Sequence, residues 1–479
     1  MPFRWKMFKM QPTQNTNVMN DATSGNDISA LLADACTRAA RYLHDIKMRR
    51  VFPLEKEIAA LARLQGPMPM HPEEPRRILA LLDEVGSPAT VASNGRRYFG
   101  FVNGAALPVC IAAQSLAAAW NQNASLRIMS PAAVVLEDVA LAWLVELFGL
   151  PPDCGAALVT GATSANLTGL AAARHTLLAR TGWDVENDGL FRAPELSVVV
   201  GEEAHVTVRK ALALLGLGRS RVTVVSADAQ GRMRADKLPR LDERTIVCVQ
   251  AGNVNTGACD PIREICTMAA RTGAWVHVDG AFGLWARVLP ERAALVDGLE
   301  LADSCATDAH KWLNVPYDCG IAFVRDAAAL RASMAAPAAY LVTGGEREPM
   351  HHTPDSSRRA RGVEVWAALR FLGRAGLRDL IRRGCDLAQE FAIALRAAGY
   401  SVLNEVVLNQ VLASFGDAAI TEEVIRRVQR EGTCWCGPTV WQGQTAMRIS
   451  VSSWMTTSED VERSVRAMVA AARAVQGGG

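Results

Sequence analysis

The chain has 479 residues, of which half are hydrophobic and 21% are charged. This composition excludes general disorder, and the length predicts two or three domains. Because 51 basic residues nearly balance 49 acidic ones, the formal charge of +2 excludes a strong electrostatic field, and we expect neither nucleic acid nor a membrane as a partner.

Residues 1–27 are polar and mixed, and we expect them to form a flexible tail. The first ten residues are basic and aromatic, but no apolar segment follows them, so they do not resemble a secretory signal. The 11 cysteines include no Cys-x-x-Cys pair, and Cys434 and Cys436 have no His neighbours at the spacing of metal ligands. We therefore predict buried thiols, no metal site and a cytoplasmic location.

Apolar residues at helical spacing predict a helix over residues 28–50, which Pro53 ends, and a second helix over residues 75–84. The opening segment, residues 28–90, contains too little apolar material for a core of its own. We expect it to pack against a larger body, such as a partner subunit.

The longest uncharged stretch, residues 98–126, is long enough to span a bilayer. It is interrupted by a proline and by several Asn and Gln side chains, which a membrane span would have to bury. We interpret it as buried protein.

Short β-rich runs alternate with helical patterns in residues 91–340, which we predict to form one large domain. The runs cover residues 156–160, 196–200, 222–225, 245–250 and 274–278, and the helical patterns cover residues 135–147, 165–180, 206–215 and 261–271. This alternation predicts an α/β fold with a mainly parallel sheet between helices. Ligands of such sheets bind beyond the carboxyl ends of the strands, so the residues after each run are candidates for a site.

The pattern changes after residue 340. Residues 341–398 are predicted to form a mobile loop, rich in Gly, His and Arg over residues 343–361, and a connecting helix over residues 363–397. Residues 399–479 are predicted to form a small α/β domain, with strands at 410–415 and 446–450 and helices at 422–430 and 459–475.

Polar residues after three of the predicted strands suggest chemistry. Thr163 and Ser164 stand at the start of a helix, where free N–H groups and the helix dipole suit a phosphate, although a helix cap without a ligand is the commoner arrangement. Asp279 ends a buried strand and needs a cationic or hydrogen-bonding partner. Lys311 follows His310 in partly apolar surroundings, which favour an amine nucleophile able to form a Schiff base.

One ligand accounts for these features together. Pyridoxal phosphate (PLP) needs a lysine for its aldehyde, a carboxylate for its pyridine nitrogen and a site for its phosphate. A flat side chain against its ring is also expected, and His205, which follows the second run, is the candidate. Each residue alone would more often be structural, His205 as a cap or a surface residue.

These motifs resemble those of the group II PLP-dependent decarboxylases, which include the aromatic amino acid, glutamate, histidine and diaminobutyrate decarboxylases. The segments concerned are residues 160–164, 204–211, 277–281 and 303–312, and further matches run from residues 51–53 to residues 448–452. The resemblance implies a fold-type I enzyme, with a mainly parallel seven-stranded sheet between helices in its large domain. It also implies a homodimer, with N-terminal helices that wrap the partner and sites at the subunit interface.

The resemblance implies a role for each residue that would contact the cofactor ring. Lys311 would be the catalytic Schiff-base residue, and Asp279 would bind the pyridine nitrogen. His205, counted with Lys311 as catalytic, would stack on one face of the ring, and Ala281 would pack against the other.

The remaining candidates belong to the phosphate and the substrate side. By the same resemblance, Thr163 and Ser164 would hold the phosphate, with His310 beside it. Asn253 would lie near the cofactor or the substrate.

We expect decarboxylation of an L-amino acid to the corresponding amine and carbon dioxide. Decarboxylases of this family carry a loop tyrosine that protonates the α-carbon, whereas residues 343–361 contain no tyrosine and Tyr340 lies before them. His351 and His352 could donate the proton instead, or could be solvated side chains. Decarboxylation with oxidative deamination to an aldehyde, a transaminase reaction and a carbon–carbon lyase reaction stay open. A non-catalytic paralogue is disfavoured because Lys311 and Asp279 are both present.

The sequence does not identify the amino acid substrate. One alternative is an aromatic wall, for which the candidates are Tyr98, Phe99, Phe101 and Trp120. The other is recognition of a polar side chain by residues 121–123. Arg448 is either a carboxylate ligand or an ordinary strand residue.

Overall fold

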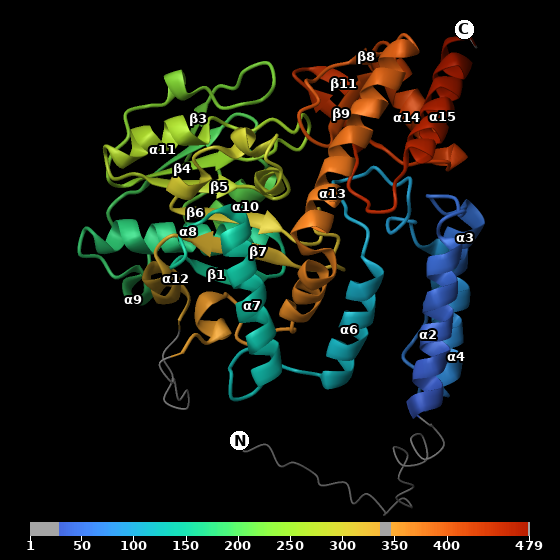
Figure 1. Cartoon of the computed structure of the whole chain (residues 1–479), viewed down its shortest axis with the longest axis horizontal. Helices are drawn as coiled ribbons and strands as arrows, with labels where there is room; N and C mark the ends of the chain where they lie inside the picture. Colours follow the sequence, from blue (N-terminus) through green and yellow to red (C-terminus); the bar gives the residue numbers. More distant parts are fainter. Residues whose placement is uncertain (1–27, 336–345, 478–479) are drawn as a thin grey trace, which may run out of the picture. The chain divides into compact units, whose positions relative to one another are not determined.

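The computed structural model of the chain describes residues 28–335 and 346–477 (Figure 1). The predicted flexible tail and Tyr340 lie outside the described residues. The chain divides into two compact units, residues 1–92 and residues 93–479. Among the described residues, none of the helices combines the length and the apolar character that a membrane span needs.

The described part of the first unit is helical. Its elements are α2 (Ile28–Asp45), α3 (Glu55–Ala60), η1 (Leu61–Leu64), α4 (Pro75–Leu81), η2 (Leu82–Gly86) and α5 (Ser87–Ala89). No residue of α2 is buried, although Arg38 and Arg41 both form ion pairs with Asp83 in η2. The unit therefore leaves apolar side chains exposed, as its low apolar content predicts.

The second unit contains a seven-stranded sheet in the order β1-β7-β6-β5-β4-β2-β3. Its strands are β1 (Gly155–Val159), β2 (Ser197–Gly201), β3 (Thr223–Val225), β4 (Thr245–Gln250), β5 (Trp275–Asp279), β6 (Ser304–Asp308) and β7 (Gly320–Val324). The pairings among β2 to β6 are parallel, and only β7, between β1 and β6, runs antiparallel to its neighbours. The predicted mainly parallel sheet is confirmed, with all five predicted runs present.

Helices cover both faces of this sheet (Figure 1). One face carries α8 (Ala162–Ala179), α10 (Val206–Leu214) and α12 (Ala327–Met334), whose apolar side chains join those of alternate strand residues in one core. The other carries α7 (Pro131–Phe148), α11 (Ile262–Ala270) and part of α13 (Gly362–Ala397). The uncharged stretch 98–126 contains α6 (Pro108–Trp120), which is too short to span a membrane.

The C-terminal part forms a smaller antiparallel sheet in the order β10-β11-β9-β8. Its strands are β8 (Ser401–Val402), β9 (Gln410–Ser414), β10 (Gly437–Trp441) and β11 (Gln444–Ser450), and its helices are α14 (Ala418–Glu431) and α15 (Ser458–Gln476). An earlier segment is bonded to it, because the Phe99 N–H donates to the Trp435 carbonyl and the Ser450 N–H donates to the Phe99 carbonyl. The start of the second unit is thus tied to its end.

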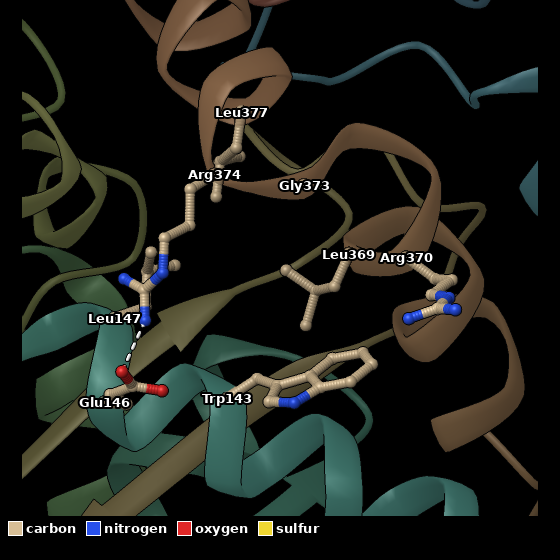
Figure 2. Close-up of a pocket in the computed structure, with 8 residues that line it drawn as sticks. All are labelled: Trp143, Glu146, Leu147, Leu369, Arg370, Gly373, Arg374 and Leu377. Carbon is tan, nitrogen blue, oxygen red and sulfur yellow. Dashed lines mark ion pairs between the residues drawn. The ribbon is translucent and has the colours of Figure 1, made fainter.

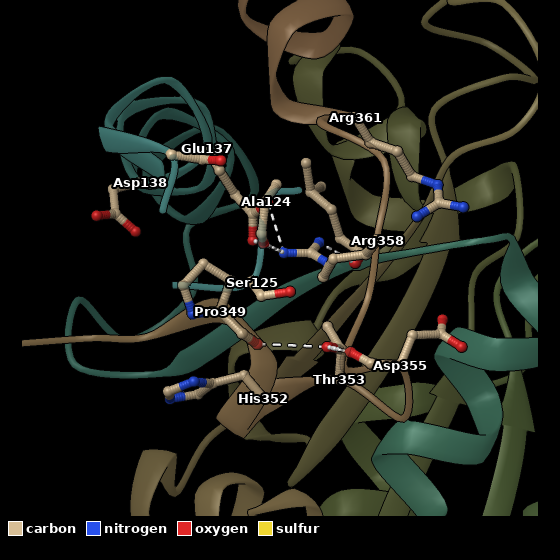
Figure 3. Close-up of polar contacts among 12 residues, drawn as sticks. Ala124, Ser125, Glu137, Asp138, Pro349, His352, Thr353, Asp355, Arg358 and Arg361 are labelled. Carbon is tan, nitrogen blue, oxygen red and sulfur yellow. Dashed lines mark hydrogen bonds and ion pairs between the residues drawn. The ribbon is translucent and has the colours of Figure 1, made fainter. Parts of the chain in front are cut away.

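Residues 346–361 differ from the mobile, solvated loop that the sequence predicts. They contain η7 (Pro349–His352), and His351 and His352 are only 5% and 8% exposed. The buried Arg358 pairs with Glu137 of α7 at 2.9 Å and donates to the carbonyl oxygens of Ala124 and Leu158 (Figure 3). A buried carboxylate with arginine partners fixes this segment, a contact that local sequence patterns do not reveal.

Candidate active site

The candidate residues gather at one edge of the large sheet. Asp279 is the last residue of β5, and Lys311 lies three residues beyond β6. His205 follows β2, and Thr163 and Ser164 lie in the first turn of α8, which follows β1. Because these four strands point in one direction, their carboxyl ends meet at the same edge.

Lys311 is held by Asp308, the last residue of β6. The Lys311 Nζ lies 2.9 Å from Asp308 Oδ2, and Asp308 Oδ1 accepts a hydrogen bond of 2.6 Å from the N–H of Ala162. One carboxylate thus joins the lysine to the start of α8. Asp308 was not among the predicted site residues, although its spacing of three residues from the lysine was a signal.

The turn that carries Lys311 is fixed by Asn314. The Oδ1 atom of Asn314 accepts from the N–H groups of Ala105 and Trp454, both at 3.0 Å, and its Nδ2 donates to the carbonyls of Trp312 at 3.0 Å and Ser452 at 3.1 Å. Asn314 also adopts a left-handed φ of 56°, which Asn tolerates better than most residues. Its partners come from distant segments, so sequence patterns could not identify its role.

Asp279 combines burial with an unsatisfied oxygen. Its side chain is 3% exposed, and Oδ1 accepts from the N–H of Ala281 at 3.2 Å, whereas Oδ2 has no partner among the described residues. Burial raises the pKa of Asp279, and the neighbouring His205 and Lys311 act in the opposite direction. A cationic ligand at Oδ2 would stabilise the ionised carboxylate.

His205 is the N-cap of α10 and lies beside the same carboxylate. Its Nδ1 accepts a hydrogen bond from the Thr207 N–H at 3.3 Å and lies 2.8 Å from the Thr207 hydroxyl. Burial lowers the pKa of His205, and Lys311 lowers it further, while Asp279 opposes the shift. The ring is therefore neutral near pH 7, and its position is fixed by the helix start.

His310 belongs to a second polar cluster near Lys311. Its Nε2 is 3.7 Å from Asp308 Oδ2, its ring packs against that of Tyr317 with centroids 4.4 Å apart, and burial lowers its pKa. The Tyr317 hydroxyl donates to Asn103 Oδ1 at 2.7 Å. Tyr317 was not a predicted site residue, because its position follows from a loop and not from a strand end.

Thr163 and Ser164 are half-buried at the start of α8, with the Ser164 hydroxyl 2.7 Å from that of Thr160. The first N–H groups of a helix lack intrahelical acceptors, which suits an anion. Asn253 is different, because its Oδ1 accepts from the N–H groups of Asn255 and Thr256 at 2.8 and 3.1 Å. It organises the loop after β4, and its Nδ2 donates at 3.5 Å to Oε1 of Gln250, the register partner of Asp279.

A half-buried arginine, Arg448, and an aromatic cluster adjoin these residues. Burial lowers the pKa of Arg448, whose charge lowers the pKa of His205, and among the described residues no carboxylate lies within ion-pairing distance of it. Tyr98 stacks on Trp435 with centroids 5.2 Å apart, and Phe101 packs on the same indole. Arg448 also lowers the pKa of Tyr98, which burial raises to about 12. Of the aromatic candidates, Tyr98 and Phe101 thus belong to one cluster, whereas Phe99 packs in the C-terminal core.

Two hollows lie apart from these residues. One lies between α7 and α13, at the kink of α13 at Gly373, and is lined by Trp143 and Leu369 and crossed by an ion pair of 2.6 Å between Glu146 and Arg374 (Figure 2). The other is lined by residues 121–123 and 357–360. Neither contains a candidate catalytic residue.

The residues present fit PLP. They supply an amine at Lys311, a helix start for a phosphate, a neutral flat ring at His205 and a buried carboxylate oxygen without a partner at Asp279. Among the described residues, no group of three or more His, Cys, Asp or Glu side chains could hold a metal ion. The residues that the sequence predicts for the cofactor lie at one edge of the sheet, where Asn253 follows β4.

Residues 61–414 match the profile of a family described as the pyridoxal-dependent decarboxylase conserved domain. The chain belongs to the pyridoxal-dependent decarboxylase family. As a member it is a PLP-dependent carboxy-lyase, and its cofactor is PLP.

Decarboxylases of different amino acids are among the relatives. L-2,4-diaminobutyrate decarboxylase of Rhizobium meliloti (strain 1021) is 30% identical over 430 residues, which are 85% of this chain and 84% of the relative. Histidine decarboxylase of Drosophila melanogaster is 30% identical over 450 residues, which are 88% of this chain but 52% of the relative. The chain thus spans about half the length of the fly enzyme.

Solved structures of the family show the same fold. The Oryza sativa protein TDC, solved with PLP and tryptamine, superposes with a TM-score of 0.86 at 23% identity and covers 96% of this chain and 99% of its own. Rhodiola rosea 4-hydroxyphenylacetaldehyde synthase superposes with a TM-score of 0.81 at 23% identity and covers 97% of this chain and 99% of its own. At these identities the likeness concerns the fold alone, and the predicted fold-type I architecture is confirmed.

Proposed function

We propose that this family member decarboxylates an L-amino acid to the corresponding amine and carbon dioxide, with Lys311 as the amine that bonds the cofactor aldehyde. The observation that carries the proposal is the meeting of Lys311, Asp279 and His205 at one sheet edge, where each shifts the pKa of a neighbour. When bound, PLP supplies a ring that accepts electrons from the bonds at the substrate α-carbon.

Each residue of the chain has a defined task in this proposal. The Asp279 carboxylate would hold a proton on the cofactor ring nitrogen, because its buried Oδ2 forms no hydrogen bond among the described residues. His205 and Ala281 confine the ring between them. Thr163 and Ser164 bind the phosphate at the start of α8, beside His310. We assign Asn253 a supporting task, because its side chain organises the loop after β4.

Arg448 is proposed to bind the carboxylate of the substrate. It is a half-buried guanidinium without an ion-pair partner among the described residues, and a ligand carboxylate would compensate its charge. The aromatic pair Tyr98 and Trp435 lies next to it. This arrangement supports recognition of the amino acid backbone and leaves the side-chain preference to be measured.

Arg448→Met should therefore raise KM roughly tenfold, since a hydrogen-bonded charge contributes about 1.5–3 kcal/mol, with a smaller change in kcat. Steady-state kinetics with the best substrate measure both constants. The exposed Arg426→Met on α14 is the control, and an unchanged KM in Arg448→Met would remove the residue from the proposal.

The sequence offers His351 and His352 as proton donors after carbon dioxide loss, whereas Tyr340 is not an obvious substitute for the loop tyrosine. Burial lowers the pKa of His352 to about 4 and also lowers that of His351, so both rings are neutral at pH 7 and poorly suited to donate a proton. We therefore infer that neither histidine is the donor, and Tyr340 is the next residue to mutate. Tyr340→Phe should slow amine formation and divert product to aldehyde, ammonia and peroxide.

An activity screen tests the reaction itself. The holoenzyme is incubated with the proteinogenic amino acids, 2,4-diaminobutyrate and cysteine sulfinate, and amine, aldehyde, ammonia and peroxide are measured. We expect amine as the product from one of them, and no amine from Lys311→Ala, which should also lose the visible absorbance of the bound cofactor. The exposed Lys237→Ala should retain both. Aldehyde with stoichiometric peroxide from the unchanged enzyme would instead support oxidative deamination.

We also propose a homodimer. The observation that supports it is the exposed apolar surface of residues 28–90, where Ile28 and Leu32 of α2 are 71% and 54% exposed. A partner subunit would cover these side chains.

A further inference from the structure

Asn166, which the proposed function does not use, is fully buried in α8. Its Nδ2 has no hydrogen-bond partner among the described residues, and neither has Oδ2 of Asp279. The Asn166 Oδ1 lies 2.9 Å from Nε2 of His277, which stands two residues before Asp279 on the same strand, and the Asn166 amide lowers the pKa of Asp279. A buried donor and a buried acceptor in the same place, both unpaired, need an explanation.

A series of hydrogen bonds fixes the Oδ1 atom of the Asn166 amide. Trp275, His277 and Asp279 alternate along β5, so all three face the side of the sheet that α8 covers. The Trp275 Nε1–H donates to Ser304 Oγ at 2.9 Å, and Ser304 Oγ lies 2.8 Å from His277 Nδ1. The His277 Nε2 lies 2.9 Å from Asn166 Oδ1.

These hydrogen bonds can run in only one direction from donor to acceptor. Burial lowers the pKa of His277 to about 3, so at pH 7 its ring is neutral and carries a single proton. Because Asn166 Oδ1 only accepts, that proton lies on Nε2, and Nδ1 accepts from the Ser304 hydroxyl. The amide is thus held with its oxygen toward His277, and both hydrogens of Nδ2 remain for another acceptor.

We propose that Asn166 is a positioning residue that donates a hydrogen bond to Asp279 and keeps that carboxylate ionised and oriented for the ring nitrogen of PLP. Ser304 and His277 contribute only by preventing the amide from turning over. Gly169 gives the imidazole its room, because a Cβ there would lie 2.9 Å from the ring. The inference rests on the proposed role of Asp279.

Cofactor affinity tests this role without recourse to activity. Apoenzyme is titrated with PLP and with its 1-deaza analogue, in which carbon replaces the ring nitrogen, and the two dissociation constants are compared. The unchanged chain should prefer PLP. Asn166→Leu should weaken PLP binding roughly tenfold, a loss typical of a hydrogen bond to a charged group, and leave the analogue within about twofold.

Two further variants make the comparison specific. Asn166→Ala removes the Nδ2 donor without the bulk of leucine, so it should show the same selective loss even if Asn166→Leu folds poorly. Thr168→Val, a buried change on the same helix, should alter neither constant. Equal weakening of both cofactors, or undiminished PLP binding, would overturn the role of Asn166. If the unchanged chain binds both cofactors equally, the assignment of Asp279 itself fails.

Discussion

At the scale of single residues, buried histidines make the fold sensitive to acid. His352 has its Nδ1 3.1 Å from the Glu348 carbonyl, and burial lowers its pKa from 6.5 to about 4. The unfolded chain therefore binds a proton more readily than the folded one. The stability that His352 contributes is complete above pH 6.5 and is lost as the pH falls toward 4, by up to about 3 kcal/mol.

His352→Gln should accordingly reduce the loss of unfolding free energy between pH 7 and pH 4. Part of the loss should remain, because the pKa of His277 is also lowered, to about 3. Urea midpoints at several pH values measure this, and the exposed His71→Gln is the control. A slope equal to that of the unchanged chain would show that His352 is not buried in solution.

The candidate residues differ in how far the sequence could predict them. Lys311, Asp279 and His205 follow strands, and the rule that ligands lie beyond strand ends finds such positions. Asp308 was missed although its spacing from Lys311 was a signal, because its other partner, Ala162, is distant in the sequence. Asn314 was missed because residues 105 and 452, which it contacts, are distant as well. Long-range contacts leave no periodic signal.

At the scale of elements, the turn after β6 depends on Asn314. Asn314→Ala removes two accepted and two donated backbone hydrogen bonds of about 3 Å, so it should destabilise the fold by roughly 3 kcal/mol or more. Thermal unfolding monitors the loss. Asn187→Ala, at an exposed helix, is the matched control, and equal melting temperatures for the two variants would contradict the role of this turn.

Elements were predicted best where burial gives a simple pattern. The runs that became β1 to β5 are apolar and bounded by turns, so their existence and order could be inferred. The strand β7 was missed, because it begins at Gly320 and pairs antiparallel with both neighbours, which the alternation of strands and helices does not indicate. The packing of residues 346–361 was missed because it depends on a long-range contact. Arg358 pairs with Glu137, which lies more than two hundred positions earlier in the sequence.

At the scale of the whole molecule, the exposed helices predict an oligomer. Leu32→Glu places a charge on the apolar side of α2. The dissociation constant of the dimer should rise at least tenfold, because burying an unpaired charge is costly. Sedimentation equilibrium measures the shift. The exposed Lys56→Glu on α3 should leave the dimer intact, and a monomeric unchanged chain would contradict the proposal.

Asn314 also sets the order of assembly during synthesis. Its Oδ1 accepts from the N–H of Trp454, so the turn that carries Lys311 lacks this partner until residue 454 has been synthesised. The large sheet can form earlier, since its last strand ends at Val324. A nascent or truncated chain that ends before residue 452 would therefore contain all strands of the large sheet together with a lysine turn that lacks its bonds to Ser452 and Trp454.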